Sequence, residues 1–245
     1  MNPLAVVVLG AGRGTRMKSS LAKVLHPLLD KPLLAYVLDM VRSLHPDRLM
    51  VVVGFQADHV RQSFPEEDLE YVLQEEQLGT GHAVQQTEKA LANFEGDLIV
   101  LCGDMPFMKA TSLQAVLKKH AETSAACTML TLKNSDIKDF GRIVRDQSDK
   151  VHRIVEAGDA TEDEKKVDEL NTGVYCFNKN LLFKALSILD NNKNSQGEFY
   201  LTDIIEYLVT QGHLVEAVQT TDAMEFLGIN TPQDLEKGEQ YLSGK

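Results

Sequence analysis

The sequence predicts an α/β fold with a Rossmann-like, open and mostly parallel (mixed) sheet that carries helices on both faces. Apolar, β-branched runs such as residues 4–9 and 98–102 are typical of strands buried on both faces, which occur in parallel sheets. Segments with helical spacing separate these runs, as right-handed βαβ units require. A glycine-rich turn over residues 10–14 follows the first run, as at the carboxyl end of a strand in such a sheet.

In the first half of the chain, strands and helices are predicted to alternate. The predicted strands are 4–9, 49–53, a segment through 71–73, and 97–102. Apolar residues at helical spacing from Leu33 to Leu44 predict a helix opened by Pro32, because proline is tolerated in a first turn. A second helix is predicted over 83–94.

The second half is predicted to be less regular. The predicted strands are 125–132, 141–145, 151–155, 173–177 and 214–218, and the predicted helices are 181–189, 202–211 and 232–242. Residues 156–169 hold seven acids against two lysines, without an apolar face. This stretch is therefore predicted to be a solvated loop.

Composition limits the function classes. The 245 residues are 43% apolar and 25% charged, as in ordinary globular proteins. A formal net charge of −11 disfavours a general nucleic-acid binder but is compatible with binding of a single nucleotide.

The three cysteines, Cys102, Cys127 and Cys176, lack the spacing of metal ligands and are expected to be reduced core thiols. The longest apolar run, 4–9, is too short to span a bilayer, and residues 1–3 carry no basic segment; a cytoplasmic protein without a membrane partner is expected.

The glycine-rich turn reads Leu9-Gly-Ala-Gly-Arg-Gly-Thr-Arg-Met17. Glycines let backbone N–H groups approach a phosphate closely. The turn differs from a dinucleotide fingerprint, which would need glycine where Thr15 stands, and no P-loop motif occurs. Residues 1–31 nevertheless have a local net charge of +4, so a polyphosphate site is predicted. A tight structural turn and a solvated basic face are the alternatives.

An acid, Asp104, follows the predicted strand that ends at Cys102, in the sequence Gly-Asp-Met-Pro. Mg²⁺ in proteins is usually held by one or two carboxylates together with substrate phosphates and waters. Asp104 is therefore a candidate ligand, with a turn-forming aspartate as the alternative.

Several motifs together resemble one family. They are Leu9 to Met17 with Lys23, Gln77-Leu-Gly-Thr-Gly-His-Ala83, Gly103-Asp104, Phe140-Gly-Arg-Ile143, Val155-Glu156, Asn171-Thr-Gly173 and Tyr200-Leu-Thr-Asp203. In these the chain closely resembles the uridylyltransferase (pyrophosphorylase) domain of the bacterial bifunctional enzymes that make UDP-N-acetylglucosamine. The resemblance covers essentially the whole chain. Ala22 stands where related domains commonly have proline, and Cys102 where some have tyrosine.

The resemblance implies Mg²⁺-dependent conversion of UTP and N-acetylglucosamine 1-phosphate into UDP-N-acetylglucosamine and pyrophosphate. The implied catalytic residues are Arg16, Lys23 and Asp104, and the implied Mg²⁺ ligands are Asp104 and Asn230. The implied nucleotide-binding residues are Leu9, Gly10, Ala11, Gly12, Gln74, Gly79 and Thr80. The implied sugar-phosphate-binding residues are Gly141, Glu156, Asn171, Tyr200 and Thr202. Taken alone, these last residues are as readily turn, core or solvated residues, and His82 is expected to be structural.

The implied organisation is a nucleotidyltransferase domain over 1–228 and a C-terminal helix or tail over 229–245. Bifunctional relatives continue into an acetyltransferase domain of hexapeptide repeats; the sequence contains none, so acetyl transfer is not expected. Whether the chain is a monofunctional relative or an excised domain stays open, as does its oligomeric state. Two alternative functions stay open: transfer with another sugar, such as glucose 1-phosphate, or another NTP, and a non-catalytic nucleotide-sugar sensor.

Overall fold

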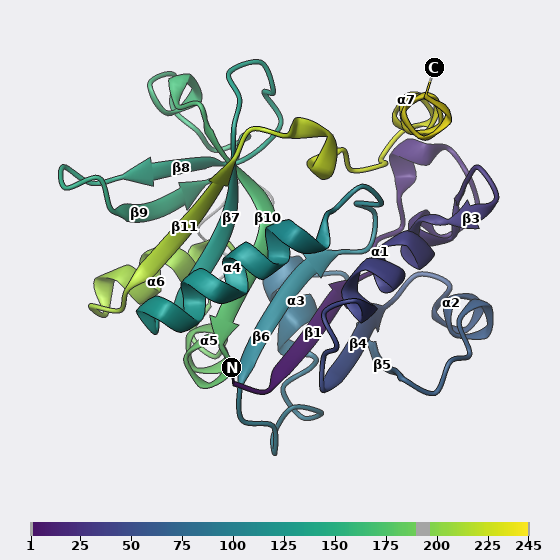
Figure 1. Ribbon diagram of the computed structural model, residues 1–245, viewed down its shortest axis with the longest axis horizontal. Coiled ribbons are helices and arrows are strands. Elements are labelled where there is room, and N and C mark those ends of the chain that lie inside the picture. Colours follow the sequence, from purple (N-terminus) through teal and green to yellow (C-terminus); the bar gives the residue numbers. More distant parts are fainter. Residues whose placement is uncertain (1, 190–196, 245) are drawn as a thin grey trace.

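A computed structural model describes residues 2–189 and 197–244, and Figure 1 shows their arrangement around one twisted sheet. The sheet has nine strands, with the order β11-β7-β10-β6-β1-β4-β5 and with β8 and β9 attached beside β10. Its strands are β1 (Leu4–Leu9), β4 (Arg48–Val53), β5 (Leu69–Leu73), β6 (Asp97–Cys102), β7 (Cys127–Lys133), β8 (Arg142–Arg145), β9 (Val151–Val155), β10 (Glu169–Asn178) and β11 (Val215–Thr220). A small hairpin of β2 (Pro27–Leu28) and β3 (Lys31–Pro32) lies apart from it.

The direction of the strands confirms a mixed sheet. β1 pairs in parallel with β4 and β6, β4 with β5, and β7 with β11. β10 runs antiparallel to both β6 and β7. The carboxyl ends of β1, β4 and β6 therefore meet at one sheet edge, where β10 contributes its amino end.

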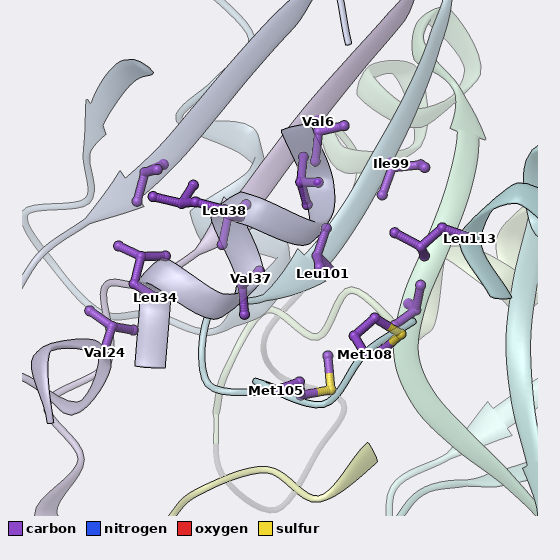
Figure 2. Close-up of a cluster of buried hydrophobic side chains, with 14 of the residues drawn as sticks. Val6, Val24, Leu34, Val37, Leu38, Ile99, Leu101, Met105, Met108 and Leu113 are labelled. Carbon is purple, nitrogen blue, oxygen red and sulfur yellow. The ribbon is translucent and has the colours of Figure 1, made fainter. Parts of the chain in front are cut away.

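Helices cover both faces of the sheet, as predicted. One face packs against α1 (Leu33–Arg42), α2 (Ala57–Ser63) and α4 (Ala110–Thr123), and the other against α3 (Thr80–Gln85), α5 (Lys179–Leu186) and α6 (Asp203–Thr210). Side chains alternate along each strand, so Val6 and Ile99 face Leu38 of α1 (Figure 2) while Val7 and Val100 belong to the opposite core. This two-sided burial explains the continuous apolar runs in the sequence.

The last helix, α7 (Pro232–Ser243), closes a smaller third cluster at the side of the molecule that bears β2 and β3 (Figure 1). A Cβ on Gly238 would lie 2.9 Å from the Phe107 ring, so the helix can approach this closely only with glycine there. The Tyr241 ring packs edge-on against the Phe107 ring, with the two ring centroids 5.2 Å apart. This packing fixes the segment that precedes α7 against the loop that follows β6.

Three helices differ most from the sequence prediction. The helix expected over 83–94 is α3, which ends at Gln85, because the Thr87 hydroxyl donates to the Val84 carbonyl at 2.7 Å and tighter turns follow. Helices α2 and α4 were not predicted. Their inward residues are sparse, Val60 in α2 and mainly Leu113 and Val116 in α4.

The predicted solvated loop over 156–169 is wrong at both ends. Glu169 is buried in β10, where the Arg145 guanidinium donates to it at 2.7 and 2.9 Å and the Thr131 hydroxyl at 2.8 Å. Burial alone would raise the pKa of Glu169, but these hydrogen bonds outweigh it and lower the pKa. Glu156 is half-buried, and its carboxylate accepts from the Thr202 hydroxyl at 2.9 Å. In the middle of the stretch, Glu164 begins a short 3-10 turn (Glu164–Lys166) and pairs with Arg153 and Thr161, while its acidic neighbours are exposed.

Among the described residues, no helix combines the length and apolar character that crossing a membrane requires.

Candidate active site

The glycine-rich loop leaves β1 at the carboxyl edge of the sheet. The Gly10 amide donates to the Val52 carbonyl at 2.8 Å, which keeps the start of the loop within the sheet. Gly14 has φ +66°, and a Cβ there would lie 2.7 Å from Cβ of Lys23. Because only glycine accepts both the dihedral angle and the contact, the loop can fold back on Lys23.

Four predicted residues from distant parts of the chain meet beside this loop. The Lys23 ammonium donates to Oδ2 of Asp104 at 2.6 Å and to Oδ1 of Asn230 at 3.0 Å. The Arg16 guanidinium donates to the same Asn230 oxygen at 2.9 Å. These contacts join the loop after β1, the end of β6 and the start of α7. Asp104 is buried, so its charge faces these cations rather than bulk solvent.

The backbone around Asn230 directs its side-chain oxygen toward the cations. The Ile229 amide donates to the Asp104 carbonyl at 3.0 Å, which ties this segment to the end of β6. The Asn230 amide donates to the Asp234 carboxylate at 3.1 Å, within the capping box of α7. Its Nδ2 donates to the Gly228 carbonyl at 3.1 Å. With the nitrogen held there, Oδ1 points to Arg16 and Lys23.

The donor set fits Mg²⁺ bound together with phosphate. A carboxylate oxygen from Asp104 and an amide oxygen from Asn230 are the hard ligands that Mg²⁺ prefers, and two protein ligands suffice when substrate oxygens and waters complete the octahedron. Within residues 2–189 and 197–244, no group of three or more histidine, cysteine or acidic side chains could hold a metal by itself.

A pocket of about 250 Å³ opens between the loop and α3. It is lined by Leu9, Gly10, Ala11, Gly12, Lys23, Val24, Gln74, Gln77, Gly79, Thr80, Ala83, Cys102, Asp104 and Glu198. All seven predicted nucleotide-binding residues therefore line the same pocket as Lys23 and Asp104, two of the three predicted catalytic residues. Sequence reasoning missed Gln77 and Glu198, although Gln77 begins the Gln-Leu-Gly-Thr-Gly motif.

Gln74 has its amide nitrogen committed to the protein. This side chain is only 3% exposed, and Nε2 donates to the Gly79 carbonyl at 3.1 Å and lies 3.1 Å from Nδ1 of His82. The Gly79 carbonyl, which can only accept, identifies this atom as the nitrogen, and Oε1 has no partner among the described residues. His82, expected to be structural, contacts Gln74 directly.

Residues 198–202, the crossing segment, pass closely over Gly79. Gly79 has φ +110°, and a Cβ there would lie 2.6 Å from the Phe199 carbonyl. The Phe199 amide donates to the Leu78 carbonyl at 2.8 Å, and the Leu201 amide donates to the Thr80 hydroxyl at 3.1 Å. The glycine permits this approach, which links the nucleotide pocket to Tyr200 and Thr202.

The predicted sugar-phosphate residues form a second, adjoining group. The Asn171 amide donates to the Gly141 carbonyl at 2.9 Å, and a Cβ on Gly141 would lie 3.2 Å from the Val155 carbonyl. The Thr202 hydroxyl donates to Glu156 at 2.9 Å. Burial raises the pKa of Glu156, and the hydrogen bond from Thr202 opposes that rise. Gly141, just before β8, thus lies beside Asn171 of β10 and the end of β9, and Glu156, just after β9, is joined to Thr202 of the crossing segment.

Glu156 and Tyr200 also line a larger, acidic pocket of about 690 Å³ between β9, α5 and α6. Burial, reinforced by the Asp159 and Glu156 carboxylates, raises the pKa of Tyr200 to about 12. This phenol therefore keeps its proton at neutral pH and can act as a donor.

Cys102 lines the pocket of about 250 Å³ together with Asp104. Burial, reinforced by the Asp104 carboxylate, raises the pKa of Cys102 to about 12, so the thiol stays protonated at neutral pH.

A glycine-rich loop, a cation pair and a carboxylate at the carboxyl edge of an open α/β sheet define a nucleotide-binding site of the phosphate-transfer class. The chain belongs to the nucleotidyl transferase family, whose model matches residues 5–236.

Sequence and structural similarity to individual proteins supports this family assignment. The chain is 47% identical over 236 residues to "Bifunctional protein GlmU" of Halalkalibacterium halodurans, covering 96% of this chain and 51% of that protein. It is 44% identical over 242 residues to the protein of the same name from Bacillus licheniformis, covering 99% and 53%. The chain thus spans about half the length of the curated relatives it matches. The crystal structure of a UDP-glucose pyrophosphorylase complexed with UDP-glucose shares the fold, with a TM-score of 0.78, 17% identity and full coverage of both chains.

Proposed function

We propose that this chain transfers UMP from UTP to N-acetylglucosamine 1-phosphate, releasing pyrophosphate and forming UDP-N-acetylglucosamine. The observation that supports this best is the convergence of Arg16, Lys23, Asp104 and Asn230 beside the glycine-rich loop. Likeness to bifunctional GlmU proteins over nearly the whole chain supports the choice of substrates.

The reaction is an in-line displacement at phosphorus. An oxygen of the sugar 1-phosphate forms a bond to the α-phosphorus of UTP, and the bond from that phosphorus to the β-phosphate oxygen breaks. The backbone of residues 9–12 holds the triphosphate, while Arg16 and Lys23 neutralise the departing pyrophosphate. Mg²⁺, held by Asp104 and Asn230, would supply charge neutralisation between the phosphate groups. No protein nucleophile is required.

Base selection rests on Gln74. Because its Nε2 is committed to Gly79 and His82, Oε1 is available as an acceptor for the N3–H of uracil. Cytosine presents a lone pair at the same ring position, so two acceptors would face each other. The backbone at Gly79 and Thr80 completes recognition of the base edge.

Sugar selection rests on the second group. Glu156 accepts hydrogen bonds from sugar hydroxyls, and Asn171 donates to the acetamido group. Gly141 lets β8 approach Val155 and Asn171 closely, Tyr200 lines the adjoining pocket with Glu156, and Thr202 holds the Glu156 carboxylate.

The decisive experiment measures pyrophosphate release with Mg²⁺ from UTP and N-acetylglucosamine 1-phosphate. Glucose 1-phosphate replaces the sugar, and ATP, CTP and GTP replace UTP, in parallel reactions. Fast release only with the first pair is the expected result. Release with another pair would retain the reaction class and reject this specificity. If no pair releases pyrophosphate although the protein still binds a UDP-sugar, a nucleotide-sugar sensor would be favoured.

The division after residue 228 and a cytoplasmic location stay predictions. Neither enters the mechanism proposed above.

A further inference from the structure

The side chain of Asn171 is held in one orientation by two donors. Oδ1 accepts from the Tyr175 hydroxyl at 2.8 Å and from the Gly173 amide at 3.2 Å. A backbone N–H can only donate, so the atom it contacts must be the oxygen of the amide. An amide oxygen has two lone pairs, and both are used here. Nδ2 is therefore directed away from Tyr175 and has no partner among the described residues.

Tyr175 is too deeply buried to contact a ligand itself, and its hydroxyl donates to Asn171. Its side chain is 2% exposed and lies beside the Phe177 ring, with the ring centroids 5.5 Å apart. Burial, reinforced by the Glu156 carboxylate, raises the pKa of Tyr175 well above its ordinary value. The phenol keeps its proton and serves as a fixed donor to Asn171.

The free amide group of Asn171 lies on the side proposed to hold the sugar phosphate. A Cβ added to Gly141 would lie 3.5 Å from Cβ of Asn171 and 3.2 Å from the carbonyl oxygen of Val155, the residue before Glu156. The register of β10 pairs Tyr175 with Val100, so the amino end of β10 reaches the same sheet edge as Asp104.

We infer that Tyr175 is a positioning residue for sugar selectivity, which holds Asn171 so that Nδ2–H faces the acetamido carbonyl of the sugar phosphate. The inference rests on the proposed function, because it requires Asn171 to contact that sugar. Without the phenol, only the longer hydrogen bond from the Gly173 amide still holds the oxygen, so the side-chain amide is oriented less firmly and Nδ2 faces the acetamido oxygen less often. Glucose 1-phosphate, with a hydroxyl that can donate or accept, is less sensitive to this reversal.

Tyr175→Phe removes a single oxygen and tests the inference. Loss of one orienting hydrogen bond is expected to raise KM for N-acetylglucosamine 1-phosphate about fivefold. The preference for this sugar over glucose 1-phosphate should fall by about the same factor, while KM for UTP changes less than about twofold. Tyr36→Phe is the matched control, since its hydroxyl donates to the Leu28 carbonyl at 2.8 Å away from both pockets. The control should alter Tm without altering selectivity.

Asn171→Asp separates failure of the inference from failure of the proposed function. It keeps an oxygen for Tyr175 and Gly173 but replaces the Nδ2 donor by an acceptor. Loss of sugar preference in Asn171→Asp with normal preference in Tyr175→Phe would overturn the inference alone. Unchanged preference in Asn171→Asp would overturn both the sugar contact and the inference. The double variant should be no less selective than Asn171→Asp, because both act through one amide.

A second readout needs no alteration at Tyr175. In ¹⁵N-labelled protein, the side-chain amide resonances of Asn171 are identified by their absence in Asn171→Asp. They should shift more on addition of UDP-N-acetylglucosamine than on addition of UDP-glucose. Equal shifts with both ligands would contradict the inference.

Discussion

The Asn230 side-chain oxygen accepts from two cations, Arg16 at 2.9 Å and Lys23 at 3.0 Å. Its two lone pairs are thereby used, and it can bind a metal only after at least one cation has moved. A triphosphate placed on the glycine-rich loop offers both cations stronger, fully charged acceptors. Under the proposed mechanism, binding of the nucleotide would therefore free the Asp104 and Asn230 oxygens that the two cations cover.

Lys23→Met should tighten Mn²⁺ binding to the nucleotide-free protein several-fold, because it frees one Asn230 lone pair and removes a positive charge 2.6 Å from Asp104. Titration of the protein alone with Mn²⁺, followed by the EPR signal of the free ion, measures this. Lys31→Met is the control, since Lys31 pairs with Asp39 instead. Equal or weaker Mn²⁺ binding in Lys23→Met would contradict the idea that the ammonium covers the site.

Asp104→Ala should lower turnover about 10²-fold or more, since a preorganised charge contact in a phosphate site is worth about 3–4 kcal/mol in the transition state. Steady-state pyrophosphate release at saturating substrates measures the effect. Asp39→Ala, which removes a surface carboxylate, should leave turnover within twofold. Activity within a few-fold of the unaltered chain would remove Asp104 from the metal site.

Glu156→Gln should stabilise the fold while weakening sugar binding. Burial raises the pKa of Glu156 above 4.5, so the charged form is disfavoured in the folded state. The resulting cost is absent below about pH 4.5 and grows as pH rises through the folded-state pKa. The Tm of Glu156→Gln should therefore match that of the unaltered chain at pH 4 and exceed it at pH 8. A Tm advantage that shrinks as pH rises would refute this assignment.

At the scale of elements, α7 connects stability to the site. Its capping-box residue Asp234 accepts from the amides of Asn230 and Thr231 and from the Thr231 hydroxyl, at 3.1, 2.9 and 2.9 Å. The same carboxylate thus begins the helix and orients a proposed metal ligand.

Asp234→Ala should lower Tm by about 2–4 °C, as loss of a cap worth about 1 kcal/mol implies for a chain of this size. It should also lower turnover several-fold, because Asn230 loses its backbone anchor. Glu236→Ala, on the exposed side of the same helix, should change neither quantity much. A normal turnover in Asp234→Ala would show that Asn230 is held sufficiently by the Gly228 carbonyl.

The strands were the most predictable elements. β1 and β6 agree with the sequence to the residue, because burial on both faces leaves uninterrupted apolar runs. Helix α4 escaped detection because its inward side includes His120, whose ring is buried beside Thr128. The predicted helix extended beyond α3 because apolar spacing continues after Gln85, whereas the backbone there continues mainly in turns with hydrogen bonds between residues three apart.

At the scale of the molecule, the site could be predicted as a set of motifs but not as a geometry. The glycine-rich loop and Asp104 each follow a recognisable strand, so their convergence followed from the parallel sheet. The contact between Lys23 and Asn230 joins positions 207 residues apart and depends on the packing of α7 against Phe107. Gln77 and Glu198 were missed because neither residue type is distinctive without the pocket around it.

UDP-N-acetylglucosamine should stabilise the whole chain against heat. Ligand at 100 times its Kd adds about 2.7 kcal/mol, which corresponds to about 5–10 °C in Tm for a chain of this length. Differential scanning fluorimetry with and without ligand measures the shift, and Gln74→Ala should reduce it. An unchanged Tm at saturating ligand would exclude binding to the folded state.

The crossing segment gives the molecule a form of heterotropic linkage. Residues 198–202 bond to Leu78, Thr80 and Gly81 on the base side, and through Thr202 to Glu156 on the sugar side. A uridine seated against Thr80 would therefore restrain the segment that carries Tyr200 and Thr202, two of the five residues proposed to contact the sugar phosphate. By reciprocity, whatever factor the nucleotide adds to the affinity for sugar phosphate, the sugar phosphate returns to the nucleotide. Under the proposed function, a substitution in residues 198–202 is therefore expected to alter the preference for base and the preference for sugar together.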